Sequence, residues 1–173
     1  MNLSFIQPPQ VAWASGALAD GPLLRKSTRI QDLTDVFADE NARQQLAGEQ
    51  VVYDVEMLDT SSAEGELYTG VTHLYPGRVG CEYFMARGHF HERREQGEVY
   101  FGLRGAGLLL LQTEQGDTRL EKVFAGSIHI IPGFTAHRLI NTGEEVLSAL
   151  ARGFRIRVFE ENNRVQAKEV QNG

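Results

Sequence analysis

Three histidines and one glutamate in this chain have the side-chain types and the spacing of a metal-binding site. His89 and His91 are separated by one residue, Glu98 follows after six more, and His137 lies further along the chain. Alternate side chains of an extended strand point to the same face, so His89 and His91 converge without a special turn. Imidazole and carboxylate donors together suit iron, manganese, nickel or zinc better than magnesium or calcium. We therefore expect one divalent transition metal.

The length and composition are typical of one soluble domain. The chain has 173 residues, of which 42% are hydrophobic, and its net charge of −6 disfavours nucleic-acid binding. Cys81 is the only cysteine, which excludes an intrachain disulfide and a cysteine zinc finger, and we expect it to be a small buried side chain. The longest purely apolar run, 108–111, is too short for a membrane span, and the N-terminus has no secretory pattern. We expect a cytoplasmic protein with no membrane contact.

Short β-rich runs separated by glycine or polar turns predict an antiparallel barrel or sandwich from residue 51 onward. The expected strands are 51–57, 67–74, 82–86, 99–103, 107–112, 119–123, 127–131, 137–141 and 146–151, with a last one at 155–159. The segment 32–46 has apolar residues at helical intervals and predicts one or two short helices, while the proline- and glycine-containing stretch before it predicts an irregular arm. The predicted organisation is an N-terminal arm over 1–50, a β-barrel over 51–160 and a polar tail over 161–173.

A second group of residues, in the second half of the chain, completes the pattern that begins at His89. Gly126, Pro132, His137 and Asn141 follow one another at intervals which, with His89, His91 and Glu98, resemble the two motifs of the cupin superfamily. In that superfamily one hairpin supplies His-x-His and Glu, and another supplies the last His. The resemblance implies an all-β fold, the double-stranded β-helix or jelly-roll-like barrel.

The gap between His91 and Glu98 is longer than is usual in cupins. With this gap, the chain from 51 to 145 resembles the cupin-type glucose-6-phosphate isomerase family; the segments that carry the likeness are 74–84, 87–91, 98–100 and 136–138. The resemblance implies metal ligation by His89, His91, Glu98 and His137, with Fe2+ as the first expectation and Mn2+, Ni2+ or Zn2+ as alternatives. It also implies contacts to a sugar phosphate from Thr72, the Gly88 backbone and Tyr100, with Tyr53 lining the site.

The implied reaction interconverts glucose 6-phosphate and fructose 6-phosphate, a step of glycolysis and gluconeogenesis. Its costly species is an enediolate whose negative charge a cation can stabilise. Glu98 and Tyr100 are the candidate catalytic residues, with Glu98 carrying a proton between C1 and C2. A carboxylate bound to a metal is a weak base, so a direct hydride shift stays open as the other route.

We also expect a homodimer, because an extended N-terminal arm is typical of cupins that pair their sheets edge to edge.

The chain departs from the family pattern at three places. Ala86 stands where the family usually has threonine, and Phe134 stands where an aromatic hydroxyl is expected. After Ala151 a loop of about a dozen residues is missing, and such a loop could exclude water from the site. These departures keep two alternatives open, a noncatalytic sugar-phosphate binder and a metal-dependent oxygenase.

Other candidate residues also have ordinary structural interpretations. His73 and His129 do not fit the motif spacing, and we interpret both as hydrogen-bonded polar residues of the strands. Thr72 and Tyr100 have residue types that strands favour, so each could be a packing residue as readily as a substrate contact.

Overall fold

Two antiparallel sheets form the body of the molecule. The computed structural model describes residues 5–60 and 67–154. The larger sheet has the order β11-β8-β13-β5-β4-β3, with β3 (Leu23–Arg29), β4 (Val51–Leu58), β5 (Leu67–Leu74), β8 (Glu98–Arg104), β11 (Ile128–Ile131) and β13 (Leu147–Phe154). The smaller sheet has the order β10-β9-β12, with β9 (Ala106–Thr113), β10 (Thr118–Phe124) and β12 (Thr135–Ile140). The expected all-β architecture is confirmed.

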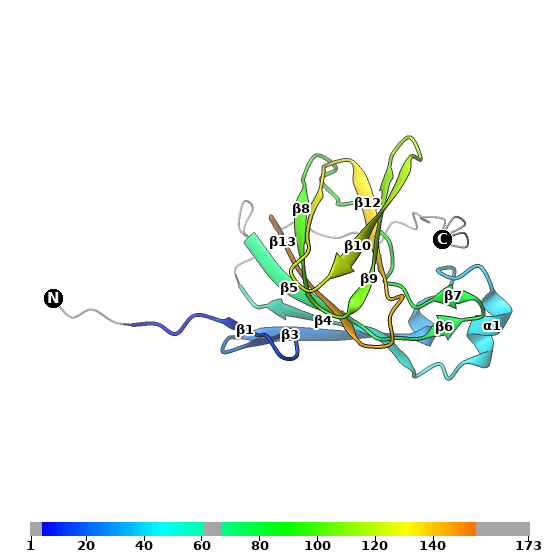
Figure 1. Ribbon diagram of the computed structural model, residues 1–173, viewed down its shortest axis with the longest axis horizontal. Coiled ribbons are helices and arrows are strands. Elements are labelled where there is room, and N and C mark those ends of the chain that lie inside the picture. Colours follow the sequence, from blue (N-terminus) through cyan, green and yellow to red (C-terminus); the bar gives the residue numbers. More distant parts are fainter. Residues whose placement is uncertain (1–4, 61–66, 155–173) are drawn as a thin grey trace.

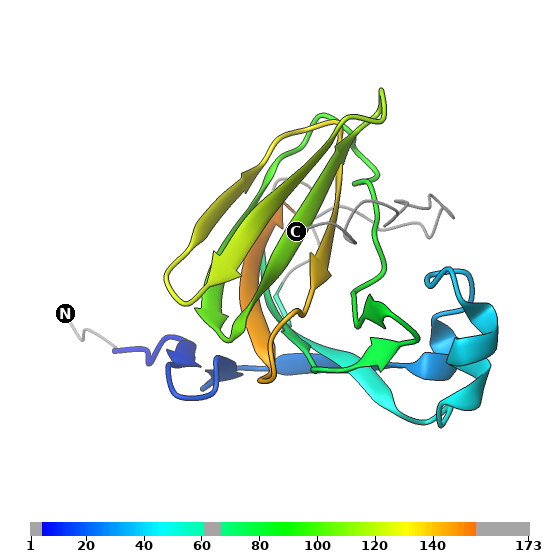
Figure 2. The same cartoon turned by 45° about the vertical axis from the view of Figure 1, so that its right-hand side comes forward.

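Two short hairpins and a helical segment lie at the ends of this body. The hairpin of β1 (Gln10–Ala12) and β2 (Ala17–Ala19) lies at one end of the molecule (Figure 1). At the other end are the hairpin of β6 (Arg78–Val79) and β7 (Glu82–Tyr83), the 3-10 turn Ile30–Asp32 and helix α1 (Glu40–Gln45) (Figure 2). The side chain of Asp39 caps α1 by accepting a hydrogen bond from the Ala42 N–H at 2.8 Å. No helix in these described ranges is long and apolar enough to cross a bilayer.

Most expected strands are present, and no end is shifted by more than three residues. The run expected at 82–86 forms a strand only at Glu82–Tyr83, followed by an isolated bridge between Met85 and Ile140. It ends early because the backbone of Phe84 turns to two other partners: its N–H donates to Gly77 and its carbonyl accepts from Asn141. The strand expected at 155–159 and the tail at 161–173 lie outside the described residues.

The N-terminal region contains more sheet than its sequence suggests. The short helices expected between 32 and 46 are confirmed by α1, but 23–29 is a full strand at the end of the larger sheet, paired with β4. Cys81 is exposed, contrary to expectation, because it lies in the tight turn between β6 and β7.

A continuous apolar core lies between the sheets and extends under the N-terminal helical segment. Its members share nearly complete burial, and they include Ile30, Leu33, Val52, Leu74, Phe84, Leu109, Leu111, Ile131, Leu139 and Leu147. Burial of such side chains contributes about 1.5–3 kcal/mol each, so this core is the main source of the stability that holds the strands in register.

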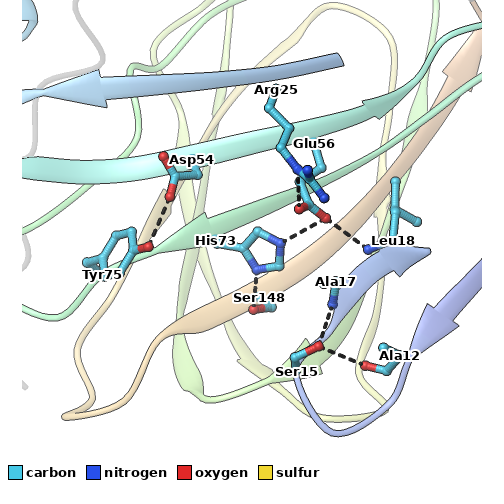
Figure 3. A network of polar contacts seen from close by, with 10 residues as sticks. All are labelled: Ala12, Ser15, Ala17, Leu18, Arg25, Asp54, Glu56, His73, Tyr75 and Ser148. Carbon is cyan, nitrogen blue, oxygen red and sulfur yellow. Dashed lines mark hydrogen bonds and ion pairs between the residues drawn. The ribbon is translucent and has the colours of Figure 1, made fainter. Parts of the chain in front are cut away.

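A polar network attaches the β1–β2 hairpin to the outer face of the larger sheet (Figure 3). The buried carboxylate of Glu56 accepts hydrogen bonds from the Leu18 N–H at 2.8 Å and from Arg25 Nε at 3.0 Å, and lies 3.5 Å from His73 Nε2. The other ring nitrogen of His73 lies 2.8 Å from Ser148 Oγ. His73 therefore has the structural role expected for it.

The network makes part of the stability depend on pH. Burial raises the pKa of Glu56, but the Leu18 N–H, Arg25 and His73 outweigh burial, and the folded-state pKa lies below the ordinary 4.5. A lowered pKa stabilises the fold above pH 4.5, and this contribution is lost as the pH falls through the folded-state value. Glu56→Gln should therefore lower the free energy of unfolding by about 1 kcal/mol at neutral pH and by less at about pH 3, measured by urea denaturation. Glu144→Gln, at an exposed position, is the control. An equal effect of Glu56→Gln at both pH values would contradict the prediction.

Candidate metal centre

Backbone pairing brings the first and last histidines of the two motifs together. The His89 N–H donates to the His137 carbonyl at 3.3 Å, and the His137 N–H donates to the His89 carbonyl at 3.1 Å. His137 lies in β12, so this pairing fixes the chain before β8 against the smaller sheet. His91 follows two residues after His89, and the rings of these two histidines have centroids 5.7 Å apart.

A short loop then returns the chain so that Glu98 can begin β8. Gln96 accepts a hydrogen bond from His91 Nδ1 through its carbonyl at 3.0 Å, and its own N–H donates to Arg93. A Cβ on Gly97 would lie 2.8 Å from the carbonyl oxygen of Ile131, so only glycine fits where this loop enters the sheet. The loop therefore both orients the His91 ring and delivers the Glu98 carboxylate.

The four side chains predicted as ligands meet inside the barrel. Ligand nitrogens of His89, His91 and His137 all lie within 4.8 Å of one another. Glu98 Oε2 lies 3.1 Å from Nε2 of both His91 and His137. His137 is 1% exposed and Glu98 is 5% exposed. The structure thus gathers three nitrogens and one oxygen at a site where His137 and Glu98 are buried and His89 and His91 are half-buried.

This arrangement fits a bound cation. Within the described residues, Nδ1 of the buried His137 has no hydrogen-bond partner, and its Nε2 faces only the Glu98 carboxylate at 3.1 Å. The Gln96 carbonyl can only accept, so His91 Nδ1 carries a hydrogen and its Nε2 faces the Glu98 carboxylate. His91 Nε2 and Glu98 Oε2 are then both acceptors, and they lie 3.1 Å apart. Two acceptors at this distance repel each other unless a proton or a cation lies between them. A nitrogen-rich donor set of this kind selects a transition metal.

The electrostatics keep most of these groups in their metal-binding forms. Burial, with the nearby His137, lowers the pKa of His89 to about 3, so this imidazole is neutral. Burial raises the pKa of Glu98, but the imidazoles of His137 and His91 and the Tyr68 hydroxyl outweigh it and hold this pKa well below its usual range. Burial also lowers the pKa of His91, but Glu98 and the Gln96 carbonyl outweigh burial and raise it overall.

Tyr68 is a member of the site that the sequence pattern did not identify. Its hydroxyl donates a hydrogen bond to Glu98 Oε1. Burial, followed by the charge of Glu98, raises the pKa of Tyr68 above its usual range, so the phenol keeps its proton. Strand alternation places Tyr68 and Thr72 on one face of β5. This alternation with Thr72, an expected substrate contact, was the only feature of the local sequence that placed Tyr68 on the side of the site.

Tyr100 packs beside the cluster. It lies two residues after Glu98 on the same face of β8, and its ring contacts His137 edge-on with centroids 5.3 Å apart. Burial, followed by the charge of Glu98, raises the pKa of Tyr100 well above its usual range. Tyr100 is therefore a neutral hydroxyl in the interior of the barrel.

The other expected substrate contacts occupy several elements. Thr72 is half-buried on β5 and pairs with Ala149 of β13, and Gly88 is buried directly before His89. Tyr53, on β4, packs against the main core. Ala86 pairs with β12 through the Leu139 carbonyl. Their contacts to a sugar phosphate are a prediction.

Two residues discussed from the sequence lie apart from the cluster. Phe134 is exposed and adopts a left-handed backbone conformation with φ of 59° at the turn before β12. His129 lies 2.7 Å from Glu121 and 2.9 Å from Ser127 through its two ring nitrogens, and so links β11 to β10. His129 has the structural role expected for it.

Comparison with known proteins identifies the family. Residues 27–170 match the family described as glucose-6-phosphate isomerase (GPI). The chain belongs to this family. The glucose-6-phosphate isomerase of Thermococcus litoralis is 38% identical over 158 residues, which cover 82% of this chain and 83% of that protein. That of Pyrococcus horikoshii is 37% identical over 155 residues, which cover 80% and 82%.

A solved structure supports the fold of this glucose-6-phosphate isomerase family member. Oxalate decarboxylase of Lactobacillus farciminis, in its formate complex, matches with a TM-score of 0.50 and 20% identity, over 63% of this chain and 30% of that chain. The likeness applies to the fold alone. The architecture is the cupin barrel, as the spacing of the motifs had indicated.

The buried ring of His137 gives a direct test of metal binding. His137→Ala removes a buried nitrogen donor, so it should lower the affinity for a divalent transition metal by more than about tenfold. Metal content after purification and dialysis, measured by mass spectrometry, would report this. His129→Ala is the matched control, because it removes a buried histidine outside the cluster. Equal metal content in the two variants would contradict the ligand assignment.

Proposed function

We propose that this chain is a metal-dependent isomerase that interconverts glucose 6-phosphate and fructose 6-phosphate. The cluster of three histidines and Glu98, in a chain of the glucose-6-phosphate isomerase family, carries the proposal. Relatives with that name match this chain over most of both lengths. The chemistry of a phosphorylated substrate also favours action in the cytoplasm, in glycolysis and gluconeogenesis.

His89, His91, Glu98 and His137 would hold the ion, with Fe2+ as the first candidate and Mn2+, Ni2+ or Zn2+ as alternatives. Such an ion supplies positive charge that stabilises the negative charge developing on O1 and O2 of the sugar. Thr72, the Gly88 backbone and Tyr100 would bind the phosphate end, and Tyr53 would line the pocket. These contacts orient C1 and C2 toward Glu98.

In the proposed reaction Glu98 moves one proton. Its carboxylate takes the proton from C2 of glucose 6-phosphate and returns it to C1, while the proton of the C2 hydroxyl passes to O1. The neutral Tyr100 hydroxyl, buried beside His137, is the second candidate for handling a substrate proton. In the other route, hydrogen moves from C2 to C1 as a hydride and Glu98 acts only as a ligand. Incorporation of solvent deuterium into the product would distinguish proton transfer from the hydride route.

The activity has a direct assay. Metal-loaded protein should convert fructose 6-phosphate to glucose 6-phosphate, detected through a coupled dehydrogenase. Glu98→Gln should lower kcat by at least about 100-fold, because it removes both the proton carrier and a charged ligand. Metal content is measured on the same samples, and Glu95→Gln, at an exposed position of the neighbouring loop, serves as the control. Absence of turnover with all four metals would refute the isomerase proposal.

One structural observation supports the noncatalytic alternative. Strand β13 runs without interruption from Leu147 to Phe154, so no loop rises from it after Ala151 to cover the site. A noncatalytic protein would bind fructose 6-phosphate in a calorimeter while the coupled assay stayed at background. Oxygen uptake by the iron-loaded protein would instead identify an oxygenase.

We also propose that the protein is a homodimer. On the outer face of the larger sheet Val99 pairs with Ile130, and the exposed fractions of Val99, Ile128 and Ile130 are 39%, 64% and 61%. Ile128 and Ile130 belong to β11, the end strand of that sheet, and Val99 belongs to the neighbouring β8. An apolar sheet face next to an edge strand is a surface that a second copy would cover.

Sedimentation equilibrium tests the dimer. The wild-type protein should have about twice the 19.3 kDa mass of the chain, and Ile130→Lys should shift the equilibrium toward the monomer because it places a charge in the interface. Leu120→Lys changes an exposed apolar residue of the smaller sheet and is the control. A wild-type mass of 19.3 kDa at all concentrations would refute the proposal.

A further inference from the structure

The two carboxylate oxygens of Glu98 lie in different surroundings. Oε2 faces the imidazoles of His91 and His137, at 3.1 Å from each Nε2. Oε1 points the other way and accepts the hydrogen bond of the Tyr68 hydroxyl. One oxygen is therefore available to the ligand cluster, and the other is already engaged by a neutral donor.

This contact depends on the register of three neighbouring strands. Gly153 of β13 pairs with Tyr68 of β5 on one side and with Glu98 of β8 on the other. The phenol thus reaches across β13, over a distance of roughly two strand spacings, about 10 Å. A Cβ on Gly153 would lie 2.9 Å from the Tyr68 hydroxyl oxygen and 3.0 Å from Cε1. Glycine at this position leaves the space that the Tyr68 ring uses.

The hydrogen bond from Tyr68 to Glu98 affects how many positions of a bound ion stay open. An ion such as manganese or iron accepts about six donors, and a carboxylate can occupy one or two of these positions. Three histidines and one oxygen of Glu98 leave two positions, enough for the adjacent O1 and O2 of a sugar. If both oxygens of Glu98 were bound, only one position would remain.

We propose that Tyr68 is a positioning residue that keeps Glu98 bound through Oε2 alone, and so preserves two positions for a chelating substrate. Tyr68 does this by holding Oε1 with its hydroxyl, without touching the metal or the reacting carbons. The part of the inference that concerns substrate rests on the proposed function. The part that concerns the metal does not.

The first test counts water molecules on bound Mn2+ in the absence of sugar. In Tyr68→Phe the free Oε1 turns toward the ion and displaces water, so the water-proton relaxation enhancement of the manganese form should fall to about half. Manganese affinity should stay equal or rise, because an extra oxygen is bound. Gly153→Ala should lower the relaxation in the same direction by crowding the phenol, and it keeps the hydroxyl in the protein.

Tyr75→Phe is the matched control. It removes a hydrogen bond of the same type, from a tyrosine hydroxyl to Asp54 at 2.9 Å, from a residue that lies outside the ligand cluster. Its relaxation should equal that of the wild type. Unchanged relaxation in Tyr68→Phe, or loss of bound manganese from it, would overturn the inference.

A second measurement separates this inference from the proposed function. If the protein is an isomerase, Tyr68→Phe should raise KM for fructose 6-phosphate by about tenfold or more, with a smaller change in kcat, because chelation by the sugar is impaired. Turnover in the wild type with unchanged manganese relaxation in Tyr68→Phe would refute the role of Tyr68 alone. Reduced relaxation without turnover in any variant would refute the isomerase and leave the role of Tyr68 intact.

Discussion

The backbone pairing of His89 with His137 is the constraint on which the site depends. These residues are far apart in the sequence, yet each donates a hydrogen bond to the carbonyl of the other. This exchange places two imidazoles side by side before any side-chain interaction is made. His91 follows along the same segment, and the loop that it orients delivers Glu98. Two separate sequence motifs thus become one cluster through a pair of ordinary sheet hydrogen bonds.

The sequence predicted this cluster through one local signal and one family pattern. Alternation along an extended segment relates His89 to His91, and the resemblance to the two cupin motifs adds Glu98 and His137. The contact of Tyr68 with Glu98 has a different origin. It requires β13 to lie between β5 and β8, two strands that precede it in the chain. The side chains that would meet across an inserted strand cannot be read from residue alternation.

The N-terminal region was difficult for a related reason. Strand β3 is mostly exposed and carries Arg25 and Lys26, because it is the last strand of its sheet. It therefore has no buried face that would produce a period of two. In the sequence of β4 alone, the charge of Glu56 is typical of a residue that faces solvent. The β1–β2 hairpin buries it and provides the Leu18 N–H as a partner. Strand boundaries depend on sheet order as much as on the residues within each strand.

From Ala149 onward, strand β13 carries only small residues on the face it shares with Glu98. These residues and their partners on β5 and β8 are Ala149 with Thr72 and Gly102, Ala151 with Gly70 and Tyr100, and Gly153 with Tyr68 and Glu98. Side chains of the flanking strands fill the volume that β13 leaves free. One methyl group added at Ala149 or Ala151 would fill part of this volume without replacing a metal-binding side chain. Substitutions at these two positions can therefore reshape the interior of the barrel without exchanging a metal ligand, whereas a side chain at Gly153 would also displace the phenol that holds Glu98.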